Sequence, residues 1–168
     1  MQPNITKSAM LNGLIVGVLL SLKFIFSAQK FNIFGLLAVF ISVLIVFVLY
    51  RMSTHFRDTE CSGTIKYGHA FNYIFLVYFF GSLISSFVIL GYTSFFDTNY
   101  LASMLDVLLK MYDSFKFPVD DKTIKILETI YKPAPFSLLN VFSSMIVGVF
   151  WGLILAALVK KEKRIFEE

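Results

Sequence analysis

Four long apolar runs dominate the chain, and short polar stretches separate most of them. The runs cover about residues 9–28, 31–50, 70–96 and 136–159, and the second contains no charged residue. At a rise of about 1.5 Å per residue, a helix of roughly 20 residues crosses about 30 Å of hydrocarbon. The pattern therefore predicts an all-α integral membrane protein in which residues 1–168 form a single domain of four transmembrane helices.

The links between the runs differ in length. Residues 29–30 alone join the first two runs, which predicts a tight antiparallel hairpin, and residues 51–69 form a polar connection too short to be a domain. Lys23 interrupts the first run near its end, where its flexible stem allows the ammonium group to reach the membrane surface. A functional lysine inside the membrane is the alternative interpretation.

A longer segment, about residues 98–131, lies between the third and fourth runs and has a different pattern. Apolar side chains recur at helical spacing from Tyr100 to Phe115 and again from Ile124 to Tyr131, with charged residues on the other side. This pattern predicts two amphipathic helices that lie along the membrane interface or pack on the bundle. Asp120 or Asp121 is expected to cap the second helix, and the prolines after Lys132 are expected to end it.

Composition supports a membrane protein and excludes several classes. Hydrophobic residues make up 57% of the chain and charged residues 15%, whereas soluble domains average about 45–50% and 25%. The net charge of +4 does not form a basic stripe with interleaved aromatic residues, so we expect no nucleic-acid partner. We expect the lipid bilayer itself to be a partner, together with another membrane protein subunit or a second copy of this chain.

The positions of the basic residues predict the orientation in the membrane. One side carries eight of them in short segments, and the other carries Lys30 and five lysines that are offset by six acidic residues. Positive charge close to the spans marks the cytoplasmic side. We therefore expect both termini in the cytoplasm and the loop 97–135 outside it. The residues expected to set topology and contact lipid head groups are Arg51, Arg57, Lys160, Lys161, Lys163 and Arg164.

Three pairs of small residues recur at a spacing of four. They are Gly13 and Gly17, Gly81 and Ser85, and Gly148 and Gly152. Such pairs let helix backbones approach closely in membranes. Packing within one four-helix bundle is the first interpretation; homodimerisation or docking to another subunit is the second.

Candidate chemistry is sparse, because no Asp, Glu or His interrupts the spans and Cys61 is the single cysteine. His55 and His69 are the histidines, and neither completes a recognisable catalytic or metal-binding motif. Side chains that could bond between helices or bind a head group are Asn72, Asn140, Ser143 and Ser144. Asp97, Asp120 and Asp121 could bind a cation, although capping is commoner. We expect no cofactor and no bound metal.

Several local sequences suggest a family. They are IKYGHAF at 65–71, FFD at 95–97 and the glycine-spaced IVG through GLI at 146–154, followed by a lysine tail. Together with the hydropathy pattern, they resemble the bacterial inner-membrane proteins of domain-of-unknown-function family 4199. The resemblance implies a bacterial inner-membrane protein of about this size and no enzyme.

Three functions follow as hypotheses. The first is a non-enzymatic accessory or scaffolding subunit of a bacterial inner-membrane complex. The alternative is a small transporter of lipid or solute, with a homodimer that has a groove between protomers as one form of it. The third is an enzyme that acts at the outer face through acidic residues, namely Asp97, Asp106, Asp113, Asp120 and Asp121.

Overall fold

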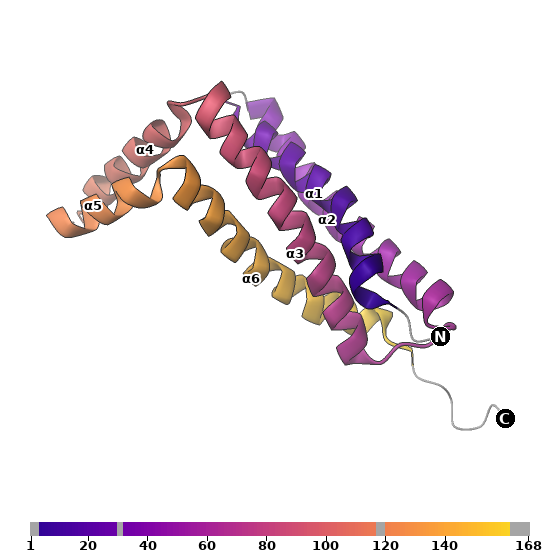
Figure 1. Cartoon of the computed structure of the whole chain (residues 1–168). Coiled ribbons are helices and arrows are strands. Elements are labelled where there is room, and N and C mark those ends of the chain that lie inside the picture. The colour runs from indigo at the N-terminus through magenta and orange to yellow at the C-terminus, as the bar shows by residue number, and fades with distance from the viewer. Residues whose placement is uncertain (1–3, 30–31, 117–119, 162–168) are drawn as a thin grey trace.

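The computed structural model describes residues 4–29, 32–116 and 120–161, and these residues form an all-helical membrane protein (Figure 1). The helices are α1 (Ile5–Ala28), α2 (Asn32–Glu60), α3 (Tyr67–Gly91), the π-helix η1 (Tyr92–Phe96), α4 (Tyr100–Ser114), α5 (Asp121–Ile130) and α6 (Pro133–Val159). Within these ranges, four segments are long and apolar enough to cross a membrane: Ile5–Ala28, Ile33–Glu60, Tyr67–Phe96 and Pro133–Val159. The prediction of four transmembrane helices is confirmed.

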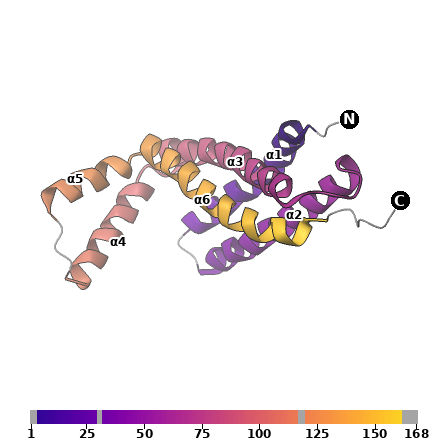
Figure 2. The ribbon, with the colours of Figure 1, turned by 90° about the horizontal axis from the view of Figure 1, so that it is seen from below.

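Helix α3 is the centre of the bundle. It packs along α1 on one side and α6 on the other, and α2 packs mainly on α1 (Figures 1 and 2). The start of α1, the end of α6 and the loop between α2 and α3 share one end of the bundle, which we call the terminal end. Helices α4 and α5 lie beyond the opposite end, which we call the arm end.

Helix α2 is longer than the hydropathy predicts. It continues ten residues past position 50, so the predicted polar connection 51–69 shrinks to a loop between Glu60 and Tyr67. The loop turns through Ser62 and Gly63, whose φ angles are 53° and 77°. Hydropathy locates the edge of the hydrocarbon, but a helix does not have to stop there. The extension is held because Ser53 and Phe56 remain buried, each 1% exposed.

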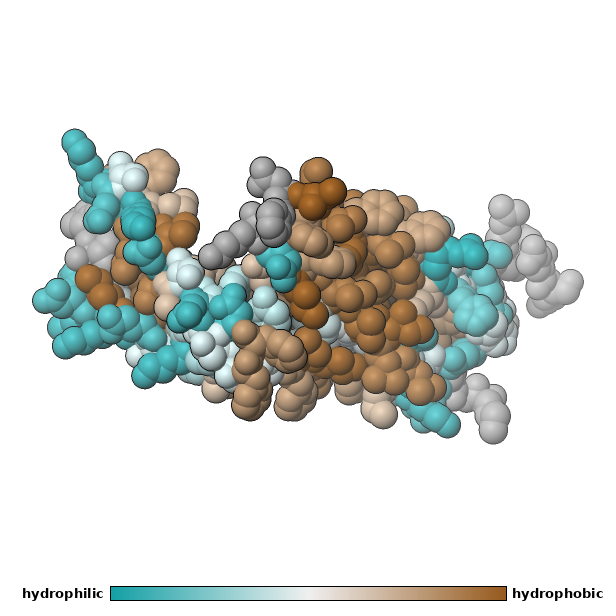
Figure 3. Space-filling model, turned by 90° about the horizontal axis from the view of Figure 1, so that it is seen from above, coloured by the Kyte–Doolittle hydropathy of each residue, from teal (hydrophilic) through white to brown (hydrophobic). Residues whose placement is uncertain are grey.

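The core fills the space between the four long helices at the terminal end. The rings of Phe56 in α2 and Tyr73 in α3 stack with their centroids 4.1 Å apart. Each long helix contributes to the same buried cluster, which includes Val16, Leu49, Ile74, Val77 and Ala156. The lipid-facing sides remain apolar, and Figure 3 shows them as a brown belt with hydrophilic residues at the terminal end.

Helices α4 and α5 form an arm that projects sideways from the bundle (Figures 1 and 2). Its root is fixed, because Leu101 is buried and the ring of Phe24 in α1 meets Tyr92 and Tyr100 edge-on, with centroids 5.6 and 5.7 Å apart. The two predicted amphipathic helices are therefore present. The chain leaves the first of these helices at Lys116, which has a φ of 53°, and residues 117–119 lie outside the described ranges.

The ends of α5 and α6 follow local sequence signals. The carboxylate of Asp120 accepts a hydrogen bond from the backbone N–H of Thr123 at 3.0 Å, so Asp120 caps α5 as predicted. Pro133 occupies the first turn of α6, where the missing N–H costs no helical hydrogen bond. The prolines thus separate the two helices by beginning the second.

Candidate functional site

The small residues of α1 and α3 face each other inside the bundle. A Cβ added to Gly13 would lie 2.7 Å from Cβ of Phe80, and one added to Gly17 would lie 2.8 Å from Cβ of Ile84. A Cβ on Gly81 would lie 3.1 Å from the backbone nitrogen of Gly17. These helices can approach this closely because the glycines have no side chain.

The second glycine pair places α6 against α3. A Cβ on Gly148 would lie 3.1 Å from Cβ of Tyr78, and one on Gly152 would lie 3.1 Å from the ring of Phe71. Ser85 is also buried, at 2% exposure. All six predicted small residues therefore lie within the chain's own bundle, and none of them presents a free face to a partner.

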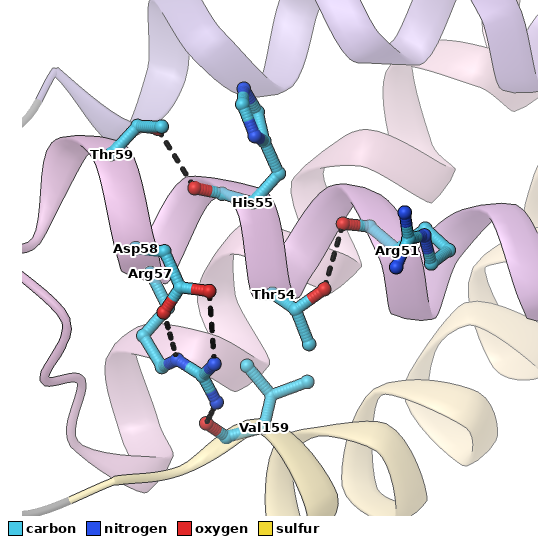
Figure 4. Close-up of polar contacts among 7 residues, drawn as sticks. All are labelled: Arg51, Thr54, His55, Arg57, Asp58, Thr59 and Val159. Carbon is cyan, nitrogen blue, oxygen red and sulfur yellow. Dashed lines mark hydrogen bonds and ion pairs between the residues drawn. The ribbon is translucent and has the colours of Figure 1, made fainter.

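Polar contacts at the terminal end join α2 to the end of α6 (Figure 4). Arg57 donates Nη1 to the carbonyl of Val159 at 3.2 Å, while its Nε and Nη2 donate to the Asp58 carboxylate at 2.8 and 3.1 Å. Ile65 and Lys161 exchange two backbone hydrogen bonds of 2.9 and 3.0 Å. We call these contacts the α2–α6 clamp.

The same end also ties α1 to the bundle. Ser8 donates its hydroxyl to Glu60 at the end of α2, at 2.7 Å, and Asn12 donates Nδ2 to the hydroxyl of Tyr73 in α3, at 2.6 Å. Since Tyr73 also stacks on Phe56, one residue contacts both α1 and α2. The polar side chains at this end hold the helices together.

Four of the six predicted topology residues, Arg51, Arg57, Lys160 and Lys161, lie at the terminal end, but their surroundings differ. Arg57 and Lys161 belong to the clamp, whereas Arg51 and Lys160 are exposed and form no ion pair with any described residue. Figure 4 shows Arg51 on α2, where its carbonyl accepts the Thr54 hydroxyl and its guanidinium bonds to no drawn residue. Lys163 and Arg164 lie outside the described residues.

Above the clamp, α2 and α6 separate and leave an apolar groove of about 510 Å³. We call it the α2–α6 groove. Its walls are Ser42, Val43, Val46, Phe47 and Tyr50 from α2 and Trp151, Leu155 and Leu158 from α6. The hydroxyl of Ser42 is already used, because it donates to the carbonyl of Ala38 at 2.9 Å. No sequence pattern predicted the groove, which depends on how two non-consecutive helices cross.

The arm carries a second apolar surface. Met104, Val107 and Met111 of α4 and Phe115, which caps its C-terminus, follow one another at spacings of three and four, and they are 40%, 57%, 52% and 66% exposed. Side chains at this spacing lie on one helix face. We call these four residues the arm stripe.

The acidic candidates do not gather into a site. Asp106 pairs with Lys110 at 2.7 Å. Asp120 caps α5, and the hydrogen bonds that its carboxylate accepts from Thr123 lower the pKa of Asp120. Asp113 and Asp121 are exposed, while Asp97 ends η1. Within the described residues, no three His, Cys, Asp or Glu side chains come close enough to hold a metal ion.

The remaining polar candidates are scattered. Asn72, Ser143 and His69 are exposed on the outside of the spans. Cys61 is partly buried in the α2–α3 loop, and burial, with a smaller effect of Glu60, raises the pKa of its thiol. A raised pKa lowers the thiolate fraction at neutral pH, which is opposite to what a nucleophilic cysteine needs.

Comparison with known proteins places the chain in a family. No curated protein and no solved structure matches it. The family described as "Protein of unknown function (DUF4199)" matches residues 11–161, which include all of α2 to α6 and most of α1. This multi-pass membrane protein therefore belongs to the DUF4199 family.

Proposed function

We propose that the protein is a non-enzymatic accessory subunit of a complex in the bacterial inner membrane, with both termini in the cytoplasm. The observation that carries the proposal is the arm stripe. It lies on a helix that stands away from the bundle, and the bundle leaves all four of its side chains exposed. A surface of this kind fits the apolar face of another membrane protein near the membrane surface.

The charges of the arm favour a protein partner over the lipid surface. Membrane-surface helices are typically rich in Lys and Arg on the polar face. Five lysines here are balanced by five acidic residues between positions 100 and 132, so the arm has no net attraction for anionic lipid. The composition of the stripe agrees with this choice, because Met and Phe are enriched in protein interfaces and Met adapts to different partners.

The bundle interior offers little support for transport of a polar solute. The buried hydroxyls of Ser21, Ser53 and Thr93 donate to main-chain carbonyls of their own helices, at 2.7, 2.7 and 2.9 Å. A polar solute that crosses a membrane protein needs groups that are free to bind it. An enzyme at the outer face also has little support, since the acidic side chains of the arm are separate and exposed.

Purification of the tagged full chain from native membranes in mild detergent tests the proposal. The double variant Met104→Ser with Met111→Ser removes both methionines of the stripe, and Ala102→Ser with Asp113→Ser is the matched control on the polar face of α4. We expect a stoichiometric membrane protein to accompany the wild type and the control. Its recovery with the stripe variant should fall by about tenfold or more, since centrally placed interface residues cost at least 1 to 2 kcal/mol each.

Two results would refute the subunit role. One is a wild-type chain that purifies alone, as a monomer or a dimer, from native membranes. The other is a companion retained equally by the stripe variant and the control, because the arm would then contribute nothing to its binding.

A further inference from the structure

The α2–α6 groove faces the lipid, and its lining ends toward the terminal end of the bundle. Tyr50 and Leu158 are the lining residues nearest the terminal end, and the clamp between Arg57 and Val159 lies just beyond them. The groove therefore runs along the spans and stops near the edge of the membrane. An occupant must be apolar inside the groove and polar only where the groove ends.

The size of the groove favours a lipid acyl chain over a partner helix as its occupant. A volume of about 510 Å³ lies within the range of about 300–1,000 Å³ that is typical of small-molecule sites. An α-helix with side chains is about 10–12 Å across, so only about one turn would fit in that volume. A single acyl chain, being narrow and flexible, fits the same elongated space between two helices.

Two exposed cations follow the last lining residues along the chain. Arg51 follows Tyr50 directly in α2, and Lys160 lies two residues after Leu158 at the end of α6. Both are exposed, and neither forms an ion pair within the described part of the chain. Arg57, in contrast, is already engaged by Asp58 and the Val159 carbonyl. Arg51 and Lys160 therefore supply positive charge near this end of the groove.

From these observations we infer that the groove is a binding site for an anionic phospholipid of the surrounding bilayer, with one acyl chain between α2 and α6 and the phosphate beside Arg51 and Lys160. Selectivity must come from the head group, because lipid tails are as apolar as the groove and gain little from entering it. A cation near a lipid surface favours an anionic lipid by about fivefold, so two give about thirtyfold. This inference does not depend on the proposed subunit role.

The single tryptophan of the chain, Trp151, lies in the groove wall, and its fluorescence reports on lipid in the groove. The full chain is reconstituted into phosphatidylcholine vesicles that contain small fractions of dibrominated phosphatidylglycerol or dibrominated phosphatidylcholine. Bromine quenches indole fluorescence on contact. We expect half-maximal quenching at about thirtyfold less of the anionic lipid than of the zwitterionic lipid at low salt.

Variants separate a built site from ordinary contact with surrounding lipid. Replacing both cations, Arg51→Gln with Lys160→Gln, should bring the two lipids within about twofold of each other. Val46→Phe fills the groove and should weaken quenching by both lipids, with Val43→Phe as a second filling variant if the first does not fold. The same change on a lipid-facing position of α1, Val18→Phe, should leave quenching as in the wild type.

The outcomes decide the matter without reference to a protein partner. Equal quenching of the wild type by the two lipids would overturn the inference. So would an anionic preference that survives the loss of both cations, or quenching that is unaffected by a folded groove-filling variant. Loss of the companion protein in the arm experiment would leave all of these results unchanged.

Discussion

The close approach of α1 and α3 makes a quantitative prediction about Gly13. In Gly13→Ala the new methyl carbon would lie 2.7 Å from Cβ of Phe80, 3.2 Å from the carbonyl oxygen of Val77 and 3.3 Å from the backbone nitrogen of Gly81. Carbon atoms in favourable contact are about 3.5–4.0 Å apart. The two helices would therefore have to separate by roughly 1 Å, and neither Cβ nor backbone atoms can rotate away.

Gly35→Ala in α2 is the matched control, because nothing lies within 4 Å of a Cβ added there. Both substitutions gain the same helix propensity, about 0.5–1 kcal/mol. The difference between them therefore isolates the packing term, which we expect to be about 1–3 kcal/mol in favour of Gly35→Ala. Each free energy of unfolding is measured by titrating the purified protein from mild detergent into sodium dodecyl sulfate and following the Trp151 fluorescence.

A second comparison tests whether the effect belongs to the interface. A Cβ at Gly17 would lie 2.8 Å from Cβ of Ile84 and 3.0 Å from the carbonyl oxygen of Gly81. Gly17→Ala should therefore lower the free energy of unfolding, relative to Gly35→Ala, by an amount similar to that of Gly13→Ala. If Gly13→Ala and Gly17→Ala are both as stable as Gly35→Ala, α1 and α3 are not packed backbone to backbone. That result would refute the close packing described here for the two helices.

Three further predictions concern the clamp, the arm and the orientation. Arg57→Ala should lower the free energy of unfolding by about 1–3 kcal/mol in the same titration, because the Val159 carbonyl at the end of α6 loses its donor. An unchanged unfolding midpoint would show that the clamp does not stabilise the fold. The lowered pKa of Asp120 means that its capping stability is present above the unfolded pKa and is lost as the pH falls through the folded pKa. The protection factors of the amides at the start of α5, which correct for the intrinsic slowing of exchange in acid, should therefore fall as the pH is lowered, and Asp120→Asn should abolish this fall. In a Cys61→Ser background, a membrane-impermeant maleimide added to intact cells should label Ser103→Cys in the arm and spare Lys66→Cys in the loop, and the reverse pattern would invert the assigned orientation.

Sequence periodicity predicted the spans well because burial in lipid acts on each helix separately. Runs of apolar residues identify a membrane helix whatever its neighbours are. The same reasoning failed at the end of α2, since residues 51–60 leave the apolar run but stay helical. Their helix is held by tertiary contacts, the burial of Phe56 and the bonds of Arg57, and no hydropathy window detects those.

The pairing of the helices is the part that single-sequence reasoning could not supply. The spacing of Gly13 and Gly17 identified a surface for close packing, but it did not show that the partner is α3. The α2–α6 groove illustrates the same limit, because its two walls come from residues about 100 positions apart. Local capping was easier to predict, since Asp120 and Thr123 are close in sequence.

The position of the clamp also determines the order in which the molecule can be completed. Helices α1, α2 and α3 follow one another in the chain and share the contacts of Tyr73, so they can assemble while the remainder is still being synthesised. Helix α6 comes after the arm, and the contacts that hold it to the bundle at the terminal end are made by Val159, its last residue, and Lys161. Until α6 is inserted, the side of α3 that bears Phe71 and Tyr78 faces lipid, because Gly148 and Gly152 of α6 are not yet packed against it. The order of the chain therefore allows a three-helix intermediate in which this side of α3 is exposed to lipid until the fourth span covers it.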